Sequence, residues 1–133
     1  MLIDKMINGG ASPVLEQVLK FTEARQSMIA DNIANKDTPG YRAKDLSVEK
    51  FQTMLRNHVE QANNGSPGSV NFDDIKSELE HPNNGILFHD GNNVSMEQLM
   101  SDNAKNVLLH NMIVELLKKQ YQTMEMSLKD HAG

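Results

Sequence analysis

The predicted fold depends on residues 95–128, which read SMEQLMSDNAKNVLLHNMIVELLKKQYQTMEMSL. This stretch contains neither Gly nor Pro, and its apolar residues recur at spacings of three and four, which is typical of an amphipathic helix. At 1.5 Å per residue the helix would be roughly 50 Å long and would need a packing partner along its length. One alternating heptad stripe holds Met96, Met100, Asn103, Val107, His110, Val114, Leu117, Tyr121, Met124 and Leu128.

The start of this helix carries its own signals. Ser95 and Gln98 have the spacing of a capping box, and Glu97 is favourable in the first turn because it lies at the positive end of the helix dipole. A turn is predicted to bring the chain to this start, and it contains Asp90, Gly91, Asn92, Asn93 and Val94.

A second heptad-like helix is predicted over residues 12–35. Ser12 suits the N-cap position and Pro13 the first helical position. Its stripe consists of Leu15, Leu19, Thr22, Gln26, Ile29 and Ile33, again at four–three spacing. We expect the chain to fold back so that the two helices pair, with Leu15, Leu19, Ile29 and Ile33 against Val107, Val114, Leu117 and Tyr121.

The residues after this helix predict a tight turn. Asn35 suits a left-handed conformation at the helix end. Pro39 and Gly40 suit the two central positions of a type II turn. Tyr41 then resumes an extended direction, and its ring is expected to pack back on the end of the helix.

The middle of the chain is less regular. Ser47 is predicted to cap a shorter helix that ends near Ala62, and residues 63–69 form a loop rich in Asn, Gly, Ser and Pro. Residues 70–79 suit a short strand or helical turn, and residues 86–88 suit a strand. We therefore predict a mainly α fold in one domain, residues 1–133. Long terminal helices form a coiled-coil-like pair, the central helix is shorter, and the middle segment is irregular, partly β or disordered.

Composition limits the class of protein. The chain has 133 residues, 38% of them hydrophobic, and a net charge of −5, which argues against a nucleic-acid or anionic-membrane surface. It has no Cys, which excludes disulfides and thiolate catalysis. No apolar run approaches the length of a membrane span, and the first residues lack the apolar core of a cleaved secretory signal.

Catalytic and metal-binding patterns are missing from the sequence. The five histidines do not show the spacing that places two imidazoles on one helix face. The segment Asp90-Gly91-Asn92 resembles the middle of a calcium loop without the remaining ligand positions, so we interpret it as a turn. We predict no enzyme activity, no cofactor and no metal site.

Two segments resemble a known family. Residues 31–41 read DNIANKDTPGY, and this resembles the motif that ends the first helix of bacterial flagellar rod and hook proteins. Within it, Asn32, Asn35, Thr38, Pro39, Gly40 and Tyr41 match the family pattern, whereas Lys36-Asp37 is a variant. The segment 90–94, followed by a helix containing His110-Asn111 and ELLKKQY at 115–121, is similar to the family's proximal-rod type.

The resemblance implies a structural subunit of the proximal rod in the flagellar basal body. It implies export through the flagellar type III apparatus without a cleaved signal, and polymerisation through paired terminal helices into the drive shaft that transmits torque. It also implies partners: other rod proteins, the rod adaptor FliE, the inner-membrane ring and further copies of the chain itself. We interpret Asn103, His110 and Asn111 as positions that set assembly contacts.

The alternative is a cytoplasmic coiled-coil adaptor or regulator that binds a partner helix. It would explain both apolar stripes without export. It would not explain why a Thr-Pro-Gly-Tyr turn ends one helix while Asp-Gly-Asn-Asn-Val precedes the other.

Overall fold

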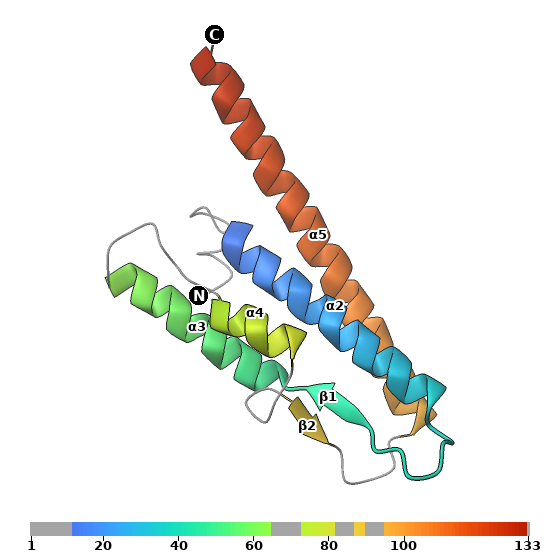
Figure 1. Ribbon diagram of the computed structural model, residues 1–133. Coiled ribbons are helices and arrows are strands. Elements are labelled where there is room, and N and C mark those ends of the chain that lie inside the picture. Colours follow the sequence, from blue (N-terminus) through green and yellow to red (C-terminus); the bar gives the residue numbers. More distant parts are fainter. Residues whose placement is uncertain (1–11, 65–72, 82–86, 90–94, 133) are drawn as a thin grey trace.

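The computed structural model describes residues 12–64, 73–81, 87–89 and 95–132 (Figure 1). The turn predicted at residues 90–94 lies outside these ranges. Four helices and a two-stranded sheet make up the described part, in the chain order α2 (Ser12–Ala34), β1 (Lys44–Leu46), α3 (Val48–Asn64), α4 (Asp73–Glu80), β2 (Leu87–His89) and α5 (Met96–Ala132).

The two long helices pair, as the stripes predict. α2 and α5 run antiparallel along most of α2, and α5 continues well past the start of α2 (Figure 1). Ser95 caps α5, since its hydroxyl oxygen accepts a 3.1 Å hydrogen bond from the backbone N–H of Gln98. The predicted mainly α fold, with a coiled-coil-like pair of terminal helices, is thereby confirmed.

α2 is the central element, because it packs on two sides. One side faces α5, and the other faces α3, α4 and β1. On this second side Phe21 stacks on Phe51 of α3 with ring centroids 4.3 Å apart. The buried cluster around them consists of Phe21, Leu46, Phe51, Leu55, Ile75 and Leu79. The sequence stripe of α2 predicted only its contact with α5.

The middle segment is more regular than predicted. Ser47 caps α3, because its hydroxyl oxygen accepts a 3.2 Å hydrogen bond from the N–H of Lys50. The segment expected as a short strand or helical turn includes α4, whose Ile75 and Leu79 are buried one turn apart. β1 and β2 pair antiparallel, with Lys44 opposite His89.

The buried row of α5 differs from the predicted stripe by one position. Residues 103, 110 and 117 face α2 as expected, but the second row consists of Leu99, Asn106 and Ile113. Met100 and Val107, one position further along, are 49% and 39% exposed. Both rows have a seven-residue period, so the periodicity alone could not decide between them.

Candidate assembly site: the helix seam and the junction after α2

α2 ends at a junction where one buried side-chain amide, that of Asn32, joins the helix, the turn that follows it and β1. The side chain of Asn32 is 5% exposed. Its Nδ2 donates to the carbonyl of Lys44 at 2.7 Å, and its Oδ1 accepts from the N–H of Lys44 at 3.1 Å. The hydroxyl of Tyr41 donates to the same Oδ1 at 2.9 Å. Asn32 therefore binds the first residue of β1 through both of that residue's backbone groups.

The turn between these partners has the predicted geometry. Gly40 has φ = 78°, as required at the third position of a type II turn, and the N–H of Tyr41 donates to the carbonyl of Thr38 at 3.2 Å. The Tyr41 side chain reaches the end of α2 through the hydrogen bond from its hydroxyl to Asn32. The pKa of the Tyr41 phenol is raised above its ordinary value, first by burial and then by the nearby carboxylate of Asp31.

Asn35 behaves differently from the prediction. No non-glycine residue in the described ranges has a positive φ, so Asn35 does not adopt the left-handed conformation. Its N–H still donates to the carbonyl of Asp31 at 2.9 Å, and its Nδ2 donates to the same oxygen at 2.9 Å. The helical hydrogen bond and the side chain hold Asn35 on the last turn, and Gly40 provides the positive φ instead.

An ion pair reinforces the junction. Arg25 donates from Nε and Nη2 to the two carboxylate oxygens of Asp45 at 3.0 and 3.1 Å. The two side chains are 15% and 21% exposed. Hydrogen bonding to Asp45 raises the pKa of the Arg25 guanidinium, and burial opposes that rise. Asp45 Oδ1 also accepts from the N–H of Leu46 at 2.7 Å, so the pair fixes β1 beside α2.

The seam between α2 and α5 is apolar toward the start of α2. Leu15, Ile113 and Leu117 form a buried cluster, and Leu19 packs against it. At the edge of the seam the hydroxyl of Tyr121 donates to Glu16 at 2.9 Å. This hydrogen bond and the charge of the Glu16 carboxylate raise the pKa of the Tyr121 phenol.

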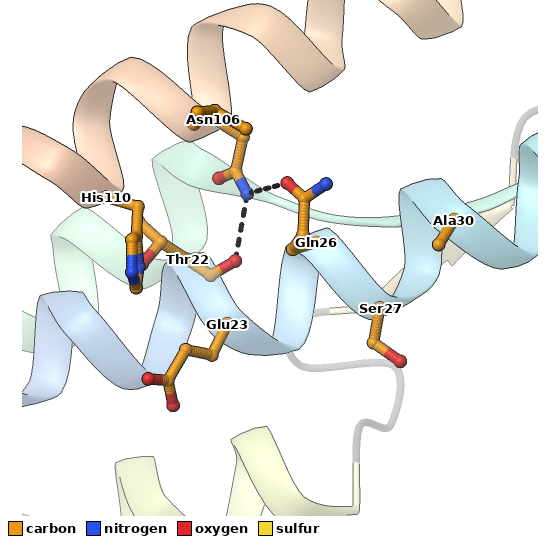
Figure 2. A pocket seen from close by; sticks show the side chains of 8 residues that line it. Thr22, Glu23, Gln26, Ser27, Ala30, Asn106 and His110 are labelled. Atoms are coloured by element: carbon orange, nitrogen blue, oxygen red, sulfur yellow. Dashed lines mark hydrogen bonds between the residues drawn. The ribbon is translucent and has the colours of Figure 1, made fainter.

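Further along, the seam becomes polar. Asn106 is 1% exposed, and its Nδ2 donates at 2.9 Å both to the carbonyl of Thr22 and to Oε1 of Gln26 (Figure 2). Gln26 in turn donates from Nε2 to Oδ1 of Asn103. The Oγ1 of Thr22 lies 3.1 Å from Nδ1 of His110. The polar members of the two predicted stripes thus meet one another, and we call these five side chains the polar layer.

The hydrogen bonds of Thr22 fix the tautomer of neutral His110. The Thr22 hydroxyl lies 2.7 Å from the carbonyl of Leu19, an acceptor to which it donates its proton. Its oxygen then accepts from His110, so the imidazole carries its proton on Nδ1. Nε2 is left as an acceptor in the neutral ring.

The residues predicted to pair occupy different depths of the seam. Leu15 and Leu117 touch in the buried cluster, and Ile29 is buried at 2% exposure. Leu19, Ile33 and Val114 are half-buried, whereas Val107 and Tyr121 are 39% and 50% exposed. The sequence analysis did not single out Asn106. The residue lies seven positions from both Leu99 and Ile113, and this heptad spacing places it on the same helix face as two apolar residues.

One groove follows the seam beside the polar layer. It has a volume of about 330 Å³. The floor holds Thr22, Gln26, Asn106 and His110 (Figure 2). The lining is completed by Glu23, Ser27, Ala30 and Val107.

The described ranges lack two further features. No helix there is both long and apolar enough to cross a membrane. Within the same ranges, no three His, Asp or Glu side chains come together in a way that could hold a metal ion.

The chain is similar to flagellar rod proteins over most of its length. Residues 19–42 match the sequence model of a family described as "Flagella basal body rod protein". The flagellar basal body rod protein FlgB of Bacillus subtilis is 28% identical over 84% of this chain and 87% of its own length. FlgB of Yersinia ruckeri is 29% identical, covering 92% of this chain and 95% of its own length. FlgB of Aquifex aeolicus is 27% identical over 88% and 91% of the two chains. The family match covers α2 from Leu19 onward and the turn that follows it, and the relatives extend the similarity across the fold, which supports a flagellar basal-body rod protein of the FlgB type.

Proposed function

We propose that this protein is a structural, non-enzymatic subunit of the proximal rod of the bacterial flagellar basal body. The observation that carries the proposal is the position of the family match. Residues 19–42 contain the α2 side of the polar layer, together with Asn32 and Tyr41 of the junction. The residues shared with the family therefore position the helix pair relative to the rest of the chain.

The geometry suits a part that transmits torque. The α2–α5 pair is the polymerising module, and α3, α4 and the small sheet form a body attached to one side of it (Figure 1). Two polar contacts connect the two long helices to this body. One is made by the buried side chain of Asn32, and the other is the half-buried ion pair between Arg25 and Asp45. Bonds of this kind resist rotation of one part against the other, because each has a narrow range of favourable angles.

The assembly roles of individual residues are part of the proposal. The seam residues Leu15, Leu19, Ile29, Ile33, Val107, Val114, Leu117 and Tyr121 hold the helix pair together and flank its contacts with neighbours. Residues 32–41 set the direction in which the chain leaves the pair. The segment 90–94, which lies outside the described residues, is assigned the entry to α5 from its sequence alone.

We also propose the finer context that the family suggests. The protein leaves the cytoplasm through the flagellar type III apparatus without a cleaved signal. It then assembles with other rod proteins, the adaptor FliE and the inner-membrane ring. Support comes from the FlgB relatives, which are named as basal body rod proteins.

Fractionation tests this function. An epitope-tagged copy should be recovered in purified basal bodies and should be lost from them when type III export is blocked. The matched control is a cytoplasmic flagellar protein, which should stay in the soluble fraction under both conditions. A protein that remains cytoplasmic in swimming cells with intact basal bodies would instead be the coiled-coil adaptor considered as the alternative.

A further inference from the structure

Arg25 lies on the edge of the helix pair that faces the body of the protein. It directly precedes Gln26, a member of the polar layer. Val14 and Val18 also directly precede seam residues of α2, and both pack against the seam cluster as well as the cluster of the body. A side chain at such a position on α2 therefore reaches α5 on one side and the body on the other. Arg25 differs from the two valines in carrying a charge.

Asp102 occupies the equivalent position on α5. It directly precedes Asn103, which accepts a hydrogen bond from Gln26 across the seam. Because α2 and α5 are both right-handed and run antiparallel, the residues directly before two paired seam residues lie on the same edge of the pair. Arg25 and Asp102 stand in this relationship, and both are half-buried. The register of the two helices thus places a cation and a carboxylate side by side.

The two edges of the helix pair differ in what covers them. The groove follows the edge formed by Glu23 and Val107, which directly follow residues of the polar layer. The opposite edge holds Leu109 and Leu116, which directly precede seam residues and pack against the seam cluster. Arg25 and Asp102 belong to this second, covered edge, away from the groove.

The Arg25 guanidinium interacts with two carboxylates from different elements. Its hydrogen bonds to Asp45 of β1 are the largest cause of its raised pKa, burial opposes the rise, and the charges of Asp45 and then of Asp102 add to it. Asp102 is itself held at the start of α5, because its Oδ1 accepts a 3.0 Å hydrogen bond from Gln98 one turn earlier. One cation on α2 therefore attracts an anion on each of its two neighbours.

We propose that Arg25 is a three-way clamp, which holds β1 through Asp45 and the start of α5 through Asp102. Asp102 is then a positioning residue, since it acts on the junction only through Arg25. The contact with Asp45 is a short, two-pronged ion pair, whereas the contact with Asp102 is an attraction between charges without such hydrogen bonds and is more sensitive to salt. This inference goes beyond the proposed function, because it concerns how three elements of a single copy are held together.

A double-mutant cycle on the purified protein tests the clamp. Urea denaturation is measured for Arg25→Met, Asp102→Asn and the two together. We expect the unfolding equilibrium constant of the double variant to depart from additivity by about two- to fivefold, in the direction of a smaller combined loss, and the departure to shrink at high salt. The control replaces Asp102→Asn by Glu97→Gln, an exposed acid in the first turn of α5, and should be additive with Arg25→Met. Arg25→Gln takes the place of Arg25→Met if the latter does not fold.

Hydrogen exchange then shows which elements the clamp holds. In the Arg25 variant, backbone N–H groups of β1 and of the first turns of α5 should exchange about twofold faster or more, while those around the buried Ile113 keep their native rates. Lys20→Met removes an exposed cation from the same helix and should change neither region. Additive energies for Arg25 and Asp102, or faster exchange in β1 alone, would overturn the clamp and leave a simple pair between Arg25 and Asp45. Both measurements use the isolated protein, so the proposed function stands or falls separately, by fractionation of basal bodies.

Discussion

The Tyr41 hydroxyl donates a 2.9 Å hydrogen bond to the Asn32 side chain across the turn that ends α2. The same Asn32 oxygen accepts from the N–H of Lys44, and the amide nitrogen donates to the Lys44 carbonyl. Asn32 thus acts toward β1 as a neighbouring strand would, by occupying both backbone groups of one residue. The family motif around these residues has a direct physical explanation, since the helix, turn and strand meet on one buried amide.

Substitutions at the Asn32 amide and its partners should lower the free energy of unfolding in proportion to the number of hydrogen bonds they remove. Asn32→Ala removes three hydrogen bonds and is expected to lower the free energy of unfolding by about 2–4 kcal/mol. Tyr41→Phe removes one bond and should cost about 0.5–1.5 kcal/mol. Urea denaturation of the purified protein measures both. The control is Asn35→Ala, a half-buried side chain whose hydrogen bonds are exposed to solvent, so that its loss should cost only about 0.5 kcal/mol. Equal losses for Asn32→Ala and Asn35→Ala would contradict this account of the junction.

The raised pKa of Tyr41 predicts a loss of stability at high pH. Burial and the Asp31 carboxylate both disfavour the phenolate in the folded protein. The unfolded chain therefore releases this proton first, near the ordinary pKa of about 10. The stability linked to Tyr41 is present below that pH and is lost as the pH rises through the folded pKa. Between about pH 9 and pH 11, thermal stability should fall more for the native protein than for Tyr41→Phe. Tyr121 is present in both proteins, so its own titration does not affect the comparison; parallel declines would refute the assignment to Tyr41.

Gly40 is required for its backbone conformation. Its φ is 78°, and a Cβ built on it would have no atom within 4 Å, so strain and not collision limits substitution. We expect Gly40→Val to cost about 1–3 kcal/mol, because a β-branched residue is unfavourable at positive φ, and to abolish swimming. Gly40→Asn is the matched control, since Asn tolerates this region. Soft-agar motility would separate the two, and normal swimming of Gly40→Val would remove the turn's proposed role.

The Arg25–Asp45 pair should contribute more than an exposed pair of the same charge. Its two-pronged geometry and low exposure lead us to expect that Asp45→Asn costs about 1–3 kcal/mol, which allows for partial screening by solvent. Lys76 and Glu80 on α4 are more than half exposed and 4.0 Å apart, so Glu80→Gln should cost about 0–0.5 kcal/mol. Denaturation curves at low and high salt measure both effects. A similar cost for the two substitutions would show that the junction does not depend on this pair.

The sequence predicted those features that are local or periodic. The two stripes indicated the helix pair, Pro39-Gly40 indicated the turn, and Ser47 and Ser95 indicated helix caps. Local residue preferences determine each of these, and so they can be inferred without tertiary information.

The remaining features depend on which partner each face meets. Residues 100 and 107 have the same period as residues 99 and 106, and only the packing against α2 selects the latter row. The second buried face of α2 could not be inferred, because Phe21 finds Phe51 through a long-range contact. Asn35 does not adopt the left-handed conformation, and its side chain bonds instead to the Asp31 carbonyl. Tertiary contacts of this kind override local preference.

The polar layer offers a final test, since it distinguishes two asparagines on α5. Asn106 is buried and bonds to Thr22 and Gln26, whereas Asn111 is exposed and does not share the environment of Asn103 and His110. Asn106→Ala should cost about 1–3 kcal/mol, because Gln26 Oε1 loses its donor inside the seam. Asn111→Ala should change the free energy of unfolding by about 0.5 kcal/mol or less.

A double-mutant cycle then isolates the interaction itself. If Asn106 acts through Gln26, the combined Gln26→Ala/Asn106→Ala variant should lose less stability than the two single variants together. We expect a coupling of about 0.5–3 kcal/mol, the range for residues in one hydrogen-bond network. Because a buried polar pair also selects one register of two helices, the urea transition of the Asn106 variant should be broader than that of the native protein, while the Asn111 variant unfolds as the native protein does. Additive energies together with a native-like transition of Asn106→Ala would mean that the apolar residues alone align α2 with α5.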